Sequence, residues 1–386
     1  PPLVFTAIVA SIANLRELQN AAGLVWRTLL WFAITALIAV FIGIALGLIM
    51  QPGVNAGVTA GAAEAPKTTG AWLDFLTGLV PANMLGITAS TKLADGAATT
   101  SLSFNVLQII VISLVVGAAA LKSGEAGRTF LAFNASALAI VRKILWWVIR
   151  LTPIGTLGLI GNAVAKYGWE TLGQLGVFAA AIYIGLALVL LVVYPALLAA
   201  HGLNPLRFFA GAWPAIQLGF VSRSSIGTLP VTETVTERLG APRTYAAFAV
   251  PLGSTTKMDG CAAIYPAISA IFVAQFFGVP LQFTDYLLIV FVSVIGSAAT
   301  AGLTGATVML TLTLSTLGLP LEGVGLLLAI DPILDMGRTA VNVAGQVLVP
   351  TIVAKRQGLL DLGAFNAREA AEAPEPQGPA HEPVAI

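Results

Sequence analysis

The sequence predicts an all-α integral membrane protein, and three observations support this prediction. The 386-residue chain is 57% hydrophobic and only 10% charged, with a mean hydropathy of +0.91, whereas soluble domains carry about 25% charged residues. Several apolar stretches reach the roughly 20 residues that a spanning helix needs. Other apolar stretches are interrupted by glycine, serine and charged residues. We therefore expect a multi-pass protein of the plasma (inner) membrane.

The composition also excludes several function classes. The net charge is +1 and there is no basic patch, so no nucleic-acid partner is expected. A single cysteine, Cys261, excludes a disulfide framework within the chain. His201 and His381 are too few for a histidine-rich metal site, and neither lies near the polar core described below. Since no GxSxG occurs either, we expect no catalytic residues and no cofactor beyond a coupling ion.

The first half of the chain contains uninterrupted apolar runs. We predict spanning helices over residues 24–49, 101–121, 140–164 and 172–200. The Gly/Ala/Thr-rich stretch 51–71 is predicted to be an exposed loop, and 72–94 an interfacial segment. The chain opens on PPLVFTAIVASIANL, without Met or the basic start of a signal peptide. We therefore expect that it begins inside a membrane helix.

The second half contains interrupted apolar segments, at 204–238, 244–277, 284–318 and 323–355. The breaks are SRSSIGTLP, GSTTKMDG and GSAATAGLTGA. Non-helical backbone at membrane depth is tolerated only where protein covers it or water fills it, and such breaks point to a transporter's central site. We predict two re-entrant hairpins with Ser/Gly tips. The alternative is ordinary inter-helix loops, but the flanking runs are short for full spans.

Polar side chains form one stripe on the last apolar segment. They are spaced by 4, 3, 1, 3 and 4 residues and fall within about 60° of one line on a helix: Asp331, Asp335, Arg338, Thr339, Asn342 and Gln346. Ionisable groups inside membrane segments usually face a protein interior or a cavity and mark a site. The alternative is a purely structural Asp335–Arg338 ion pair, yet the amide and hydroxyl groups extend the stripe beyond any pair.

Further charges lie in the broken segments, namely Arg223, Lys257 and Asp259. If these meet the stripe, the interior holds equal numbers of cations and carboxylates. A guanidinium binds a carboxylate in a two-pronged way that lysine cannot copy, and a carboxylate suits an ammonium. Arg338 and Asp335, one turn apart, are therefore what a site for an acidic amino acid needs. Half-helix ends at the tips can supply N–H groups for a second carboxylate.

The chain resembles the dicarboxylate/amino acid:cation symporter family, the glutamate transporters and their prokaryotic homologues. The matching stretches are SRSSIGTLPVT, PLGSTTKMDG, GSAATAGLTGA, GLPLEGVGLLLAIDPILDMGRTAVNVAG and LTPIGTLGLIGNAVAKYG. The resemblance, from Pro1 to about Lys355, implies a glutamate-transporter-like fold of eight membrane helices and two re-entrant hairpins. It also implies a homotrimer in the lipid bilayer, with a transport domain that moves like an elevator. By this comparison the first helix and half of the second are absent.

We predict four parts of the chain. These are the partial scaffold and transport helices (1–62), the scaffold and intervening helices (63–200), the transport core (201–355) and a disordered cytoplasmic tail (356–386). Disorder is expected in the tail because it is rich in Ala, Glu and Pro and lacks apolar periodicity.

The resemblance also assigns the substrate residues. Arg338 would bind the side-chain carboxylate of the substrate and Asp335 its amino group. The remaining substrate-binding positions are Thr339, Asn342, Arg223, Ser224, Ser225, Ala301, Gly302 and Leu303, the last three at the gate, and Cys261, where the family usually has Thr. An acid at 335 is unusual in dicarboxylate carriers, and Arg338 is replaced in the neutral amino acid branch. Both features favour glutamate or aspartate.

The cation sites depart from the family pattern. Lys257 replaces the Asn of NMDG, and Gln346 replaces an Asp after NVxG, so the site gains about two units of positive charge, comparable to two sodium ions. We hypothesise that the Lys257 ammonium, paired with Asp259, stands in for sodium; buried lysines can also exchange a proton. The alternative is that Lys257 extends to an interface.

Other cation positions are partly altered. Phe32 and Ala36 stand where the family has a Tyr and a Ser, although Thr35 remains. A residual sodium site would use the backbone near Thr255, Ser297 and Thr300. Tyr265 replaces the Glu of the human carriers, so potassium counter-transport is not expected. The sequence thus predicts import of glutamate or aspartate driven by protons or by fewer sodium ions. The alternatives are a proton-coupled C4-dicarboxylate carrier and a non-transporting remnant of the family.

Overall fold

The protein was analysed as a computed structural model of the whole chain. The structure describes residues 21–54, 83–85, 87–94, 97–104, 106–150, 175–296, 305–328 and 330–367, together with residues 2, 5, 6, 9, 10, 80, 81 and 154. Helices form most of this part of the chain, as the apolar composition predicts.

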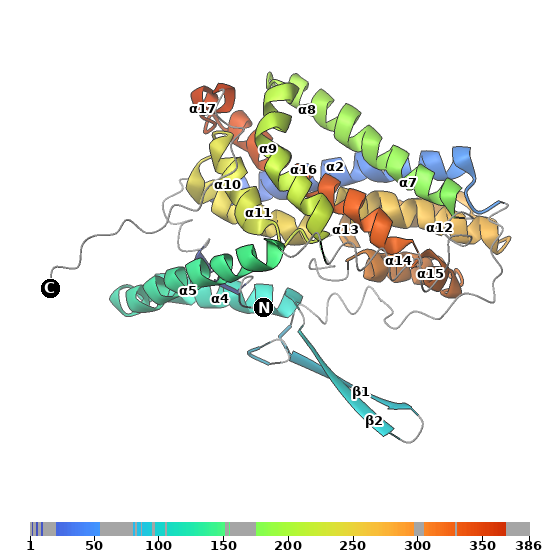
Figure 1. Cartoon of the computed structure of the whole chain (residues 1–386), viewed down its shortest axis with the longest axis horizontal. Helices are drawn as coiled ribbons and strands as arrows, with labels where there is room; N and C mark the ends of the chain where they lie inside the picture. Colours follow the sequence, from blue (N-terminus) through green and yellow to red (C-terminus); the bar gives the residue numbers. More distant parts are fainter. Residues whose placement is uncertain are drawn as a thin grey trace.

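A bundle of helices contains the core of the molecule (Figure 1). Its elements are α2 (Ala21–Met50), α7 (Gly176–Leu188), η2 (Val189–Val193), α8 (Tyr194–Ala200), α9 (Pro205–Ser222), α10 (Leu229–Arg238), α11 (Arg243–Thr256), η3 (Asp259–Ile264), α12 (Tyr265–Phe276), α13 (Phe283–Gly296), α14 (Gly305–Thr316), α15 (Glu322–Leu327), α16 (Asp331–Arg356) and α17 (Leu362–Asn366). Helix α16 is buried along most of its length and packs against α2, α9, α10, α11 and η3.

Three helices of the described part are long and apolar enough to cross a membrane, namely Gly23–Met50, Gly176–Ala200 and Arg243–Phe276. The first two confirm the predicted spans 24–49 and 172–200. The second is continuous because η2 is a π-helical turn inside it, a feature that often occurs near functional sites. The third is interrupted where α11 ends, at Lys257 and Met258, as the sequence predicts.

One prediction of secondary structure is wrong. The described part is not all-α, because β1 (Ile87–Ala94) and β2 (Ala97–Phe104) pair antiparallel in a hairpin. The predicted span 101–121 therefore starts as a strand and becomes helical only from Val106. The overlooked signal is Asp-Gly at positions 95 and 96, between two Thr/Ser-rich stretches, since this dipeptide is typical of two-residue hairpin loops. The hairpin projects away from the bundle (Figure 1).

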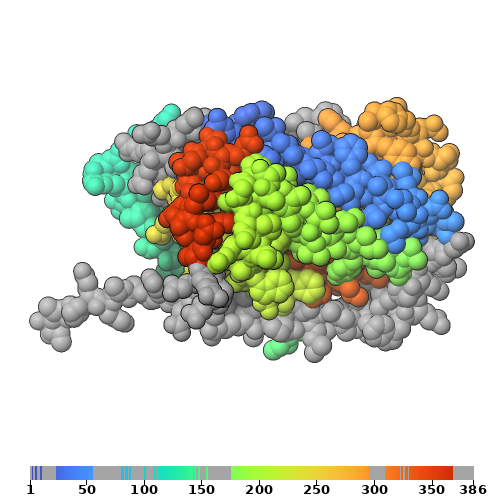
Figure 2. Space-filling model, turned by 90° about the horizontal axis from the view of Figure 1, so that it is seen from above, coloured from blue at the N-terminus to red at the C-terminus, as the bar shows by residue number. Residues whose placement is uncertain are grey.

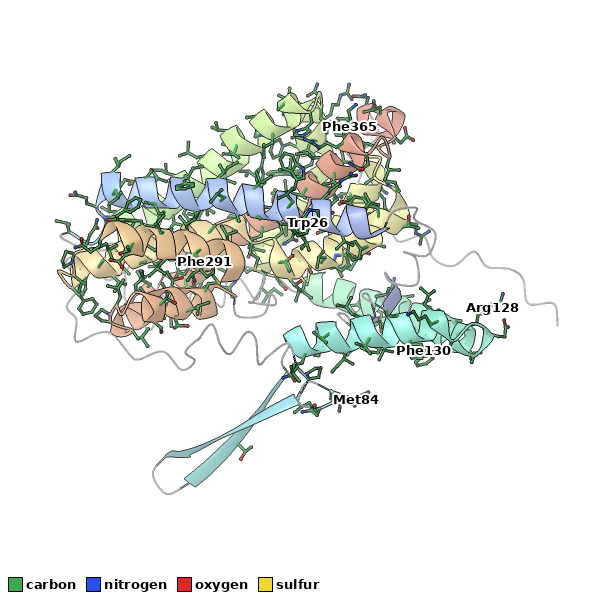
Figure 3. All side chains as sticks on the ribbon, turned by 180° about the vertical axis from the view of Figure 1, so that it is seen from behind. Trp26, Met84, Arg128, Phe130, Phe291 and Phe365 are labelled. Carbon is green, nitrogen blue, oxygen red and sulfur yellow. The ribbon has the colours of Figure 1, made fainter. Side chains whose placement is uncertain are left out.

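A pair of helices, α4 (Val106–Lys122) and α5 (Glu125–Arg150), lies between the hairpin and the bundle (Figure 1). The predicted span 140–164 overlaps only the end of α5, and most of its second half lies outside the described residues. Figure 3 shows Arg128 and Phe130 near the start of α5. Leu138 of α5 packs with Leu229 and Val250 of the bundle, which joins this pair to α10 and α11.

The predicted break at SRSSIGTLP is present, because α9 ends at Ser222 and α10 begins at Leu229 while the two helices pack on each other. The break between α13 and α14 falls on 297–304, outside the described residues.

The prediction of disorder from Arg356 onward is wrong for residues 357–367. Asp361 caps α17 by accepting from the Ala364 N–H at 3.1 Å, and its own N–H donates to the Gly240 carbonyl at 2.9 Å. Phe365 is buried in the core (Figure 3). The apolar residues of GLLDLGAF form only a short run before the polar tail, so the sequence pattern did not reveal this helix. Residues 368–386 lie outside the described residues.

We expect Phe365→Ala to detach α17 from the bundle. A Phe-to-Ala change in a packed core costs about 3–5 kcal/mol, and the cavity would form where α17 meets the bundle. The measurement is the unfolding temperature in detergent, compared with Leu362→Ala, whose side chain is exposed. Equal unfolding temperatures for the two variants would show that α17 adds nothing to stability.

Candidate functional site

The predicted polar stripe lies on α16 and faces inward. Arg338, Thr339, Asn342 and Gln346 are buried, while the carboxylates of Asp331 and Asp335 remain partly exposed. Helix α16 begins at Asp331 with a proline in its first turn, a position that proline favours. The burial of these side chains shows that the stripe faces the interior of the bundle, close to the ends of α9 and α11.

Arg338 is the centre of a buried charge cluster. Its Nη2 donates to Asp331 Oδ1 at 2.6 Å and to Asp335 Oδ1 at 3.2 Å, although its side chain is wholly inaccessible. A buried charge needs such partners because desolvation is costly. The purely structural alternative thus gains support from these two ion pairs, but they occupy only one nitrogen of the guanidinium.

The other two nitrogens of Arg338, Nε and Nη1, are buried and have no hydrogen-bond partner among the described residues. The guanidinium lies 4.0 Å from the ring centroid of Tyr265, which fixes its plane through a cation–π contact. Buried donors are rarely left unsatisfied, and such an exception calls for an explanation. Nε and Nη1 point to different sides of the guanidinium, so a carboxylate of a ligand could bind one of them and a second acceptor of the ligand the other.

Asn342 connects the substrate stripe to the broken helix beside it. Its Oδ1 accepts from the N–H groups of Gly260 at 2.8 Å and Cys261 at 3.4 Å, and its Nδ2 donates to Cys261 Sγ at 3.1 Å. Cys261 Sγ also lies 3.8 Å from Asp335 Oδ1. Asp335, Thr339, Asn342 and Cys261 are therefore brought together as predicted, with Thr339 Oγ1 3.5 Å from Asp335 Oδ1.

Gly260 allows η3 to approach α16 closely. A Cβ at this position would lie 2.5 Å from the Arg338 carbonyl oxygen and 2.8 Å from its Cα. We expect Gly260→Ala to displace Arg338 at a cost of about 1–3 kcal/mol, which corresponds to roughly 5- to 150-fold weaker substrate binding. Substrate titration of uptake measures this, with Gly176→Ala as the control because open space surrounds Gly176. An unchanged half-saturation concentration would contradict the packing argument.

The break between α9 and α10, which was predicted as the tip of the first hairpin, lies beside the charge cluster of Arg338. Arg223 ends α9 in the left-handed backbone region (φ 53°), which residues other than glycine rarely adopt. Its Nη1 donates to the Pro332 carbonyl at 3.4 Å, so the tip is attached to the start of α16. The Ser224 hydroxyl accepts from the Gly227 N–H at 2.9 Å, and Ser225 is buried. The arrangement brings these tip residues to the end of α16 that carries Asp331 and Asp335.

A second buried cluster surrounds Lys257, which does not extend to an interface. Its ammonium forms an ion pair with Asp259, and both side chains are inaccessible. It also donates to the Tyr194 hydroxyl at 3.3 Å, and this hydroxyl lies 2.9 Å from Asp259 Oδ2. Thr35 Oγ1 donates to the other carboxylate oxygen of Asp259 at 3.5 Å. Side chains of lysine, tyrosine and threonine therefore surround Asp259. The lysine ammonium compensates the charge of Asp259, which would otherwise need a bound cation.

Gln346 closes this cluster from α16. Its Nε2 donates to the Lys257 carbonyl at 3.2 Å, whereas its Oε1 is buried without a partner among the described residues. The lack of a side chain at Gly253 allows Phe32 and Gln346 to lie close to its backbone, because a Cβ at this position would contact both side chains. The charges of the two clusters balance, with Arg223, Arg338 and Lys257 against Asp259, Asp331 and Asp335.

The remaining predicted residues are only partly placed. Thr255 is buried, and its hydroxyl donates to the Leu252 carbonyl of its own helix at 2.8 Å. The others lie outside the described residues: Ser297, Thr300, Ala301, Gly302 and Leu303. Two contributors were missed as binding residues, Tyr194 beside Lys257 and Tyr265 over Arg338. A tyrosine next to a proline in an apolar run, as in both cases, is the weak signal that could have indicated them.

A balanced set of buried charges, held by helices that break beside them, defines a membrane transport protein rather than a structural bundle. The comparisons agree with this class. The family model of the sodium:dicarboxylate symporter family matches residues 1–356, and the chain belongs to this family. It is therefore a multi-pass protein of the plasma membrane.

Three relatives illustrate the range of named substrates. The chain is 35% identical to an uncharacterized symporter of Haemophilus influenzae, over 91% of this chain and 81% of the relative. It is 32% identical to the L-cystine uptake protein TcyP of Shouchella clausii (95% and 80% covered). It is 28% identical to the proton/sodium-glutamate symport protein of Bacillus subtilis (93% and 83% covered).

Proposed function

We propose that this symporter imports an acidic amino acid, glutamate or aspartate. The observation that supports this most is the buried Arg338, whose Nε and Nη1 have no hydrogen-bond partner among the described residues while Nη2 is held by two carboxylates. The side-chain carboxylate of the substrate would bind one of these donors, a second acceptor of the substrate the other, and its ammonium would bind Asp335. The relative from Bacillus subtilis, named for glutamate, is in line with this assignment.

Coupling is proposed to use protons, or fewer sodium ions than the family pattern provides. The Lys257 ammonium is held by Asp259 and the Tyr194 hydroxyl, and Thr35 donates to Asp259 from the other side. Release of a proton by Lys257 would leave the buried Asp259 without a counter-charge, which is unfavourable. We therefore propose that Lys257 exchanges a proton with the solvent only when the cluster opens. We further propose a homotrimer in which the core around α16 moves like an elevator.

L-cystine is a second candidate substrate. Asp331 contacts Arg338 as closely as 2.6 Å and is partly exposed, so the pocket offers a second carboxylate for a second ammonium. Cystine carries two amino acid ends, and a relative at 32% identity is named for its uptake. A C4-dicarboxylate, without any ammonium, would leave Asp335 unmatched.

The test is uptake into proteoliposomes of the purified protein. Labelled glutamate, aspartate and cystine are offered under a sodium gradient or a pH gradient alone, and succinate is added as a competitor. Accumulation of glutamate or aspartate against its gradient, unaffected by succinate, is expected. Accumulation of cystine alone would replace the acidic substrate, and no accumulation of any compound would favour a non-transporting member of the family.

A further inference from the structure

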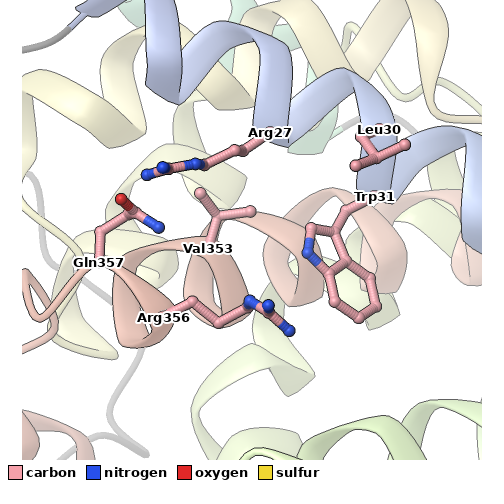
Figure 4. A pocket seen from close by; sticks show the side chains of 6 residues that line it. All are labelled: Arg27, Leu30, Trp31, Val353, Arg356 and Gln357. Carbon is pink, nitrogen blue, oxygen red and sulfur yellow. The ribbon is translucent and has the colours of Figure 1, made fainter.

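A cavity of about 270 Å³ lies far from the substrate residues, at the opposite end of α16. It is an open cavity between the N-terminal part of α2 and the C-terminal end of α16 (Figure 4). Its lining consists of Arg27, Leu30, Trp31, Val353, Arg356 and Gln357. Two guanidinium groups and no carboxylate thus line it, which makes the cavity a candidate site for an anion.

Neither arginine forms an ion pair with an acidic residue in the described part of the chain. Arg356 is instead oriented by aromatic rings, since its guanidinium lies 5.6 Å from the Trp31 ring and its Nη1 lies 3.4 Å from His201 Nε2. His201 Nδ1 is 2.7 Å from the Leu197 carbonyl. This nitrogen must therefore donate, which leaves Nε2 as the acceptor for Arg356. The guanidinium is positioned while its charge stays unneutralised.

An exposed apolar face continues from this cavity along α2. Its members recur every four and seven residues, and therefore share one side of the helix: Trp26 (66% exposed), Leu30 (45%), Leu37 (39%), Phe41 (55%) and Leu48 (45%). From Trp26 to Leu48 this apolar face is about 33 Å long at 1.5 Å per residue, close to the roughly 30 Å of a bilayer's hydrocarbon core. Figure 2 shows α2 at the surface beside α7 and α8, and Figure 3 shows Trp26 on it.

The distribution of charge places the cavity at the cytoplasmic interface. Basic residues gather at this end of the bundle, at the starts of α9 and α11 and the ends of α10 and α16: Arg207, Arg238, Arg243 and Lys355. Asp285 lies in the first turn of α13, near the other end. Basic residues favour the cytoplasmic side, and tryptophan favours the interface, which Trp26 and Trp31 satisfy here.

We infer that the cavity binds a phosphate group, and that this is the headgroup of an anionic phospholipid of the cytoplasmic leaflet. Arg27 and Arg356 would bind the phosphate oxygens, as guanidinium groups do. The acyl chains would lie along the apolar face of α2. This combination of two cations and a bilayer-length apolar face favours a lipid over free phosphate, which has no apolar part. Because Arg356 ends the helix that carries Arg338, the lipid would link α16 to α2.

The test is native mass spectrometry of the purified full chain with added phosphatidylglycerol or phosphatidylcholine. Phosphatidylglycerol is expected to bind more tightly, and Arg27→Gln and Arg356→Gln to weaken it by roughly fivefold each and about 25-fold together. Arg207→Gln with Arg243→Gln is the matched control, since both lie at the same end but outside the cavity. Both cavity arginines are exposed, so their replacement should leave the fold intact, which unfolding temperatures check.

Four results would overturn the assignment. Equal retention of both lipids, or unchanged retention by the double cavity variant, would show that the arginines do not select an anionic headgroup. Displacement of the lipid by millimolar inorganic phosphate would identify a free-phosphate site instead. Loss of lipid binding on association of two chains would show that a second copy covers the α2 face. None of these readouts depends on which substrate is transported.

Discussion

Arg338→Lys is expected to reduce glutamate uptake at least 100-fold while leaving the protein folded. Lysine keeps the positive charge that Asp331 and Asp335 require, but its compact ammonium cannot replace a planar group with donors on separate sides, such as Nε and Nη1. Two charge-assisted hydrogen bonds to the substrate are lost, at about 1.5 kcal/mol or more each, which together amount to roughly two decades in affinity. The measurement is the concentration dependence of labelled glutamate uptake, with unfolding temperature as the check on folding.

Arg128→Lys is the matched control. Arg128 is exposed on α5 and pairs with Glu125 at 2.9 Å, so the same chemical change there should leave uptake unaltered. If Arg338→Lys also transports at the parental rate, the arginine serves only to join Asp331 and Asp335, and the acidic substrate assignment fails.

Lys257→Asn combined with Gln346→Asp is expected to make uptake depend on sodium. The two changes lower the formal charge of the interior by two units and restore the residue types of the family pattern. The protein must then take up cations from solution to compensate Asp259 and the new carboxylate. We expect the parent to accumulate substrate under a pH gradient without sodium, and the double variant to require sodium, with at least tenfold less uptake in its absence.

Two comparisons separate this effect from damage to the fold. Lys257→Met leaves Asp259 buried without a counter-charge, which costs about 3–5 kcal/mol, so it should lower the unfolding temperature regardless of ions. Lys143→Asn, an exposed position on α5, should change nothing. Sodium dependence already present in the parent protein would refute the idea that Lys257 replaces the ion.

Much of the fold followed from local patterns in the sequence. Uninterrupted apolar runs identified α2 and the α7–α8 helix, and polar breaks identified the ends of α9 and α11. The hairpin β1–β2 was missed because its residues were judged by hydropathy alone, although their alternation and the Asp-Gly pair are typical of strands. Helix α17 was missed because its formation depends on a tertiary contact, the burial of Phe365, that no local pattern encodes.

In the candidate site, too, the sequence predicted some residues from local patterns and missed others that depend on tertiary contacts. The helical period placed Asp331, Asp335, Arg338 and Asn342 on one line, and the structure brings them together. Tyr194 and Tyr265 could not be assigned in this way, because each reaches the site from another helix and only the packing of α8 and α12 against α16 determines their neighbours. The sequence likewise indicated the charge of Lys257 but not the direction of its side chain.

The hydrogen bonds of Asn342 have a thermodynamic consequence. One amide holds the backbone of Gly260 and the thiol of Cys261 next to Asp335, and Asp259, the partner of Lys257, directly precedes Gly260. A ligand that moves α16 therefore shifts the cation cluster through Asn342, beside the separate contact of Gln346 with the Lys257 carbonyl. Such coupling between sites is reciprocal. The factor by which a proton or sodium ion tightens substrate binding must equal the factor by which substrate tightens binding of that ion, and Asn342→Ala should reduce both factors together.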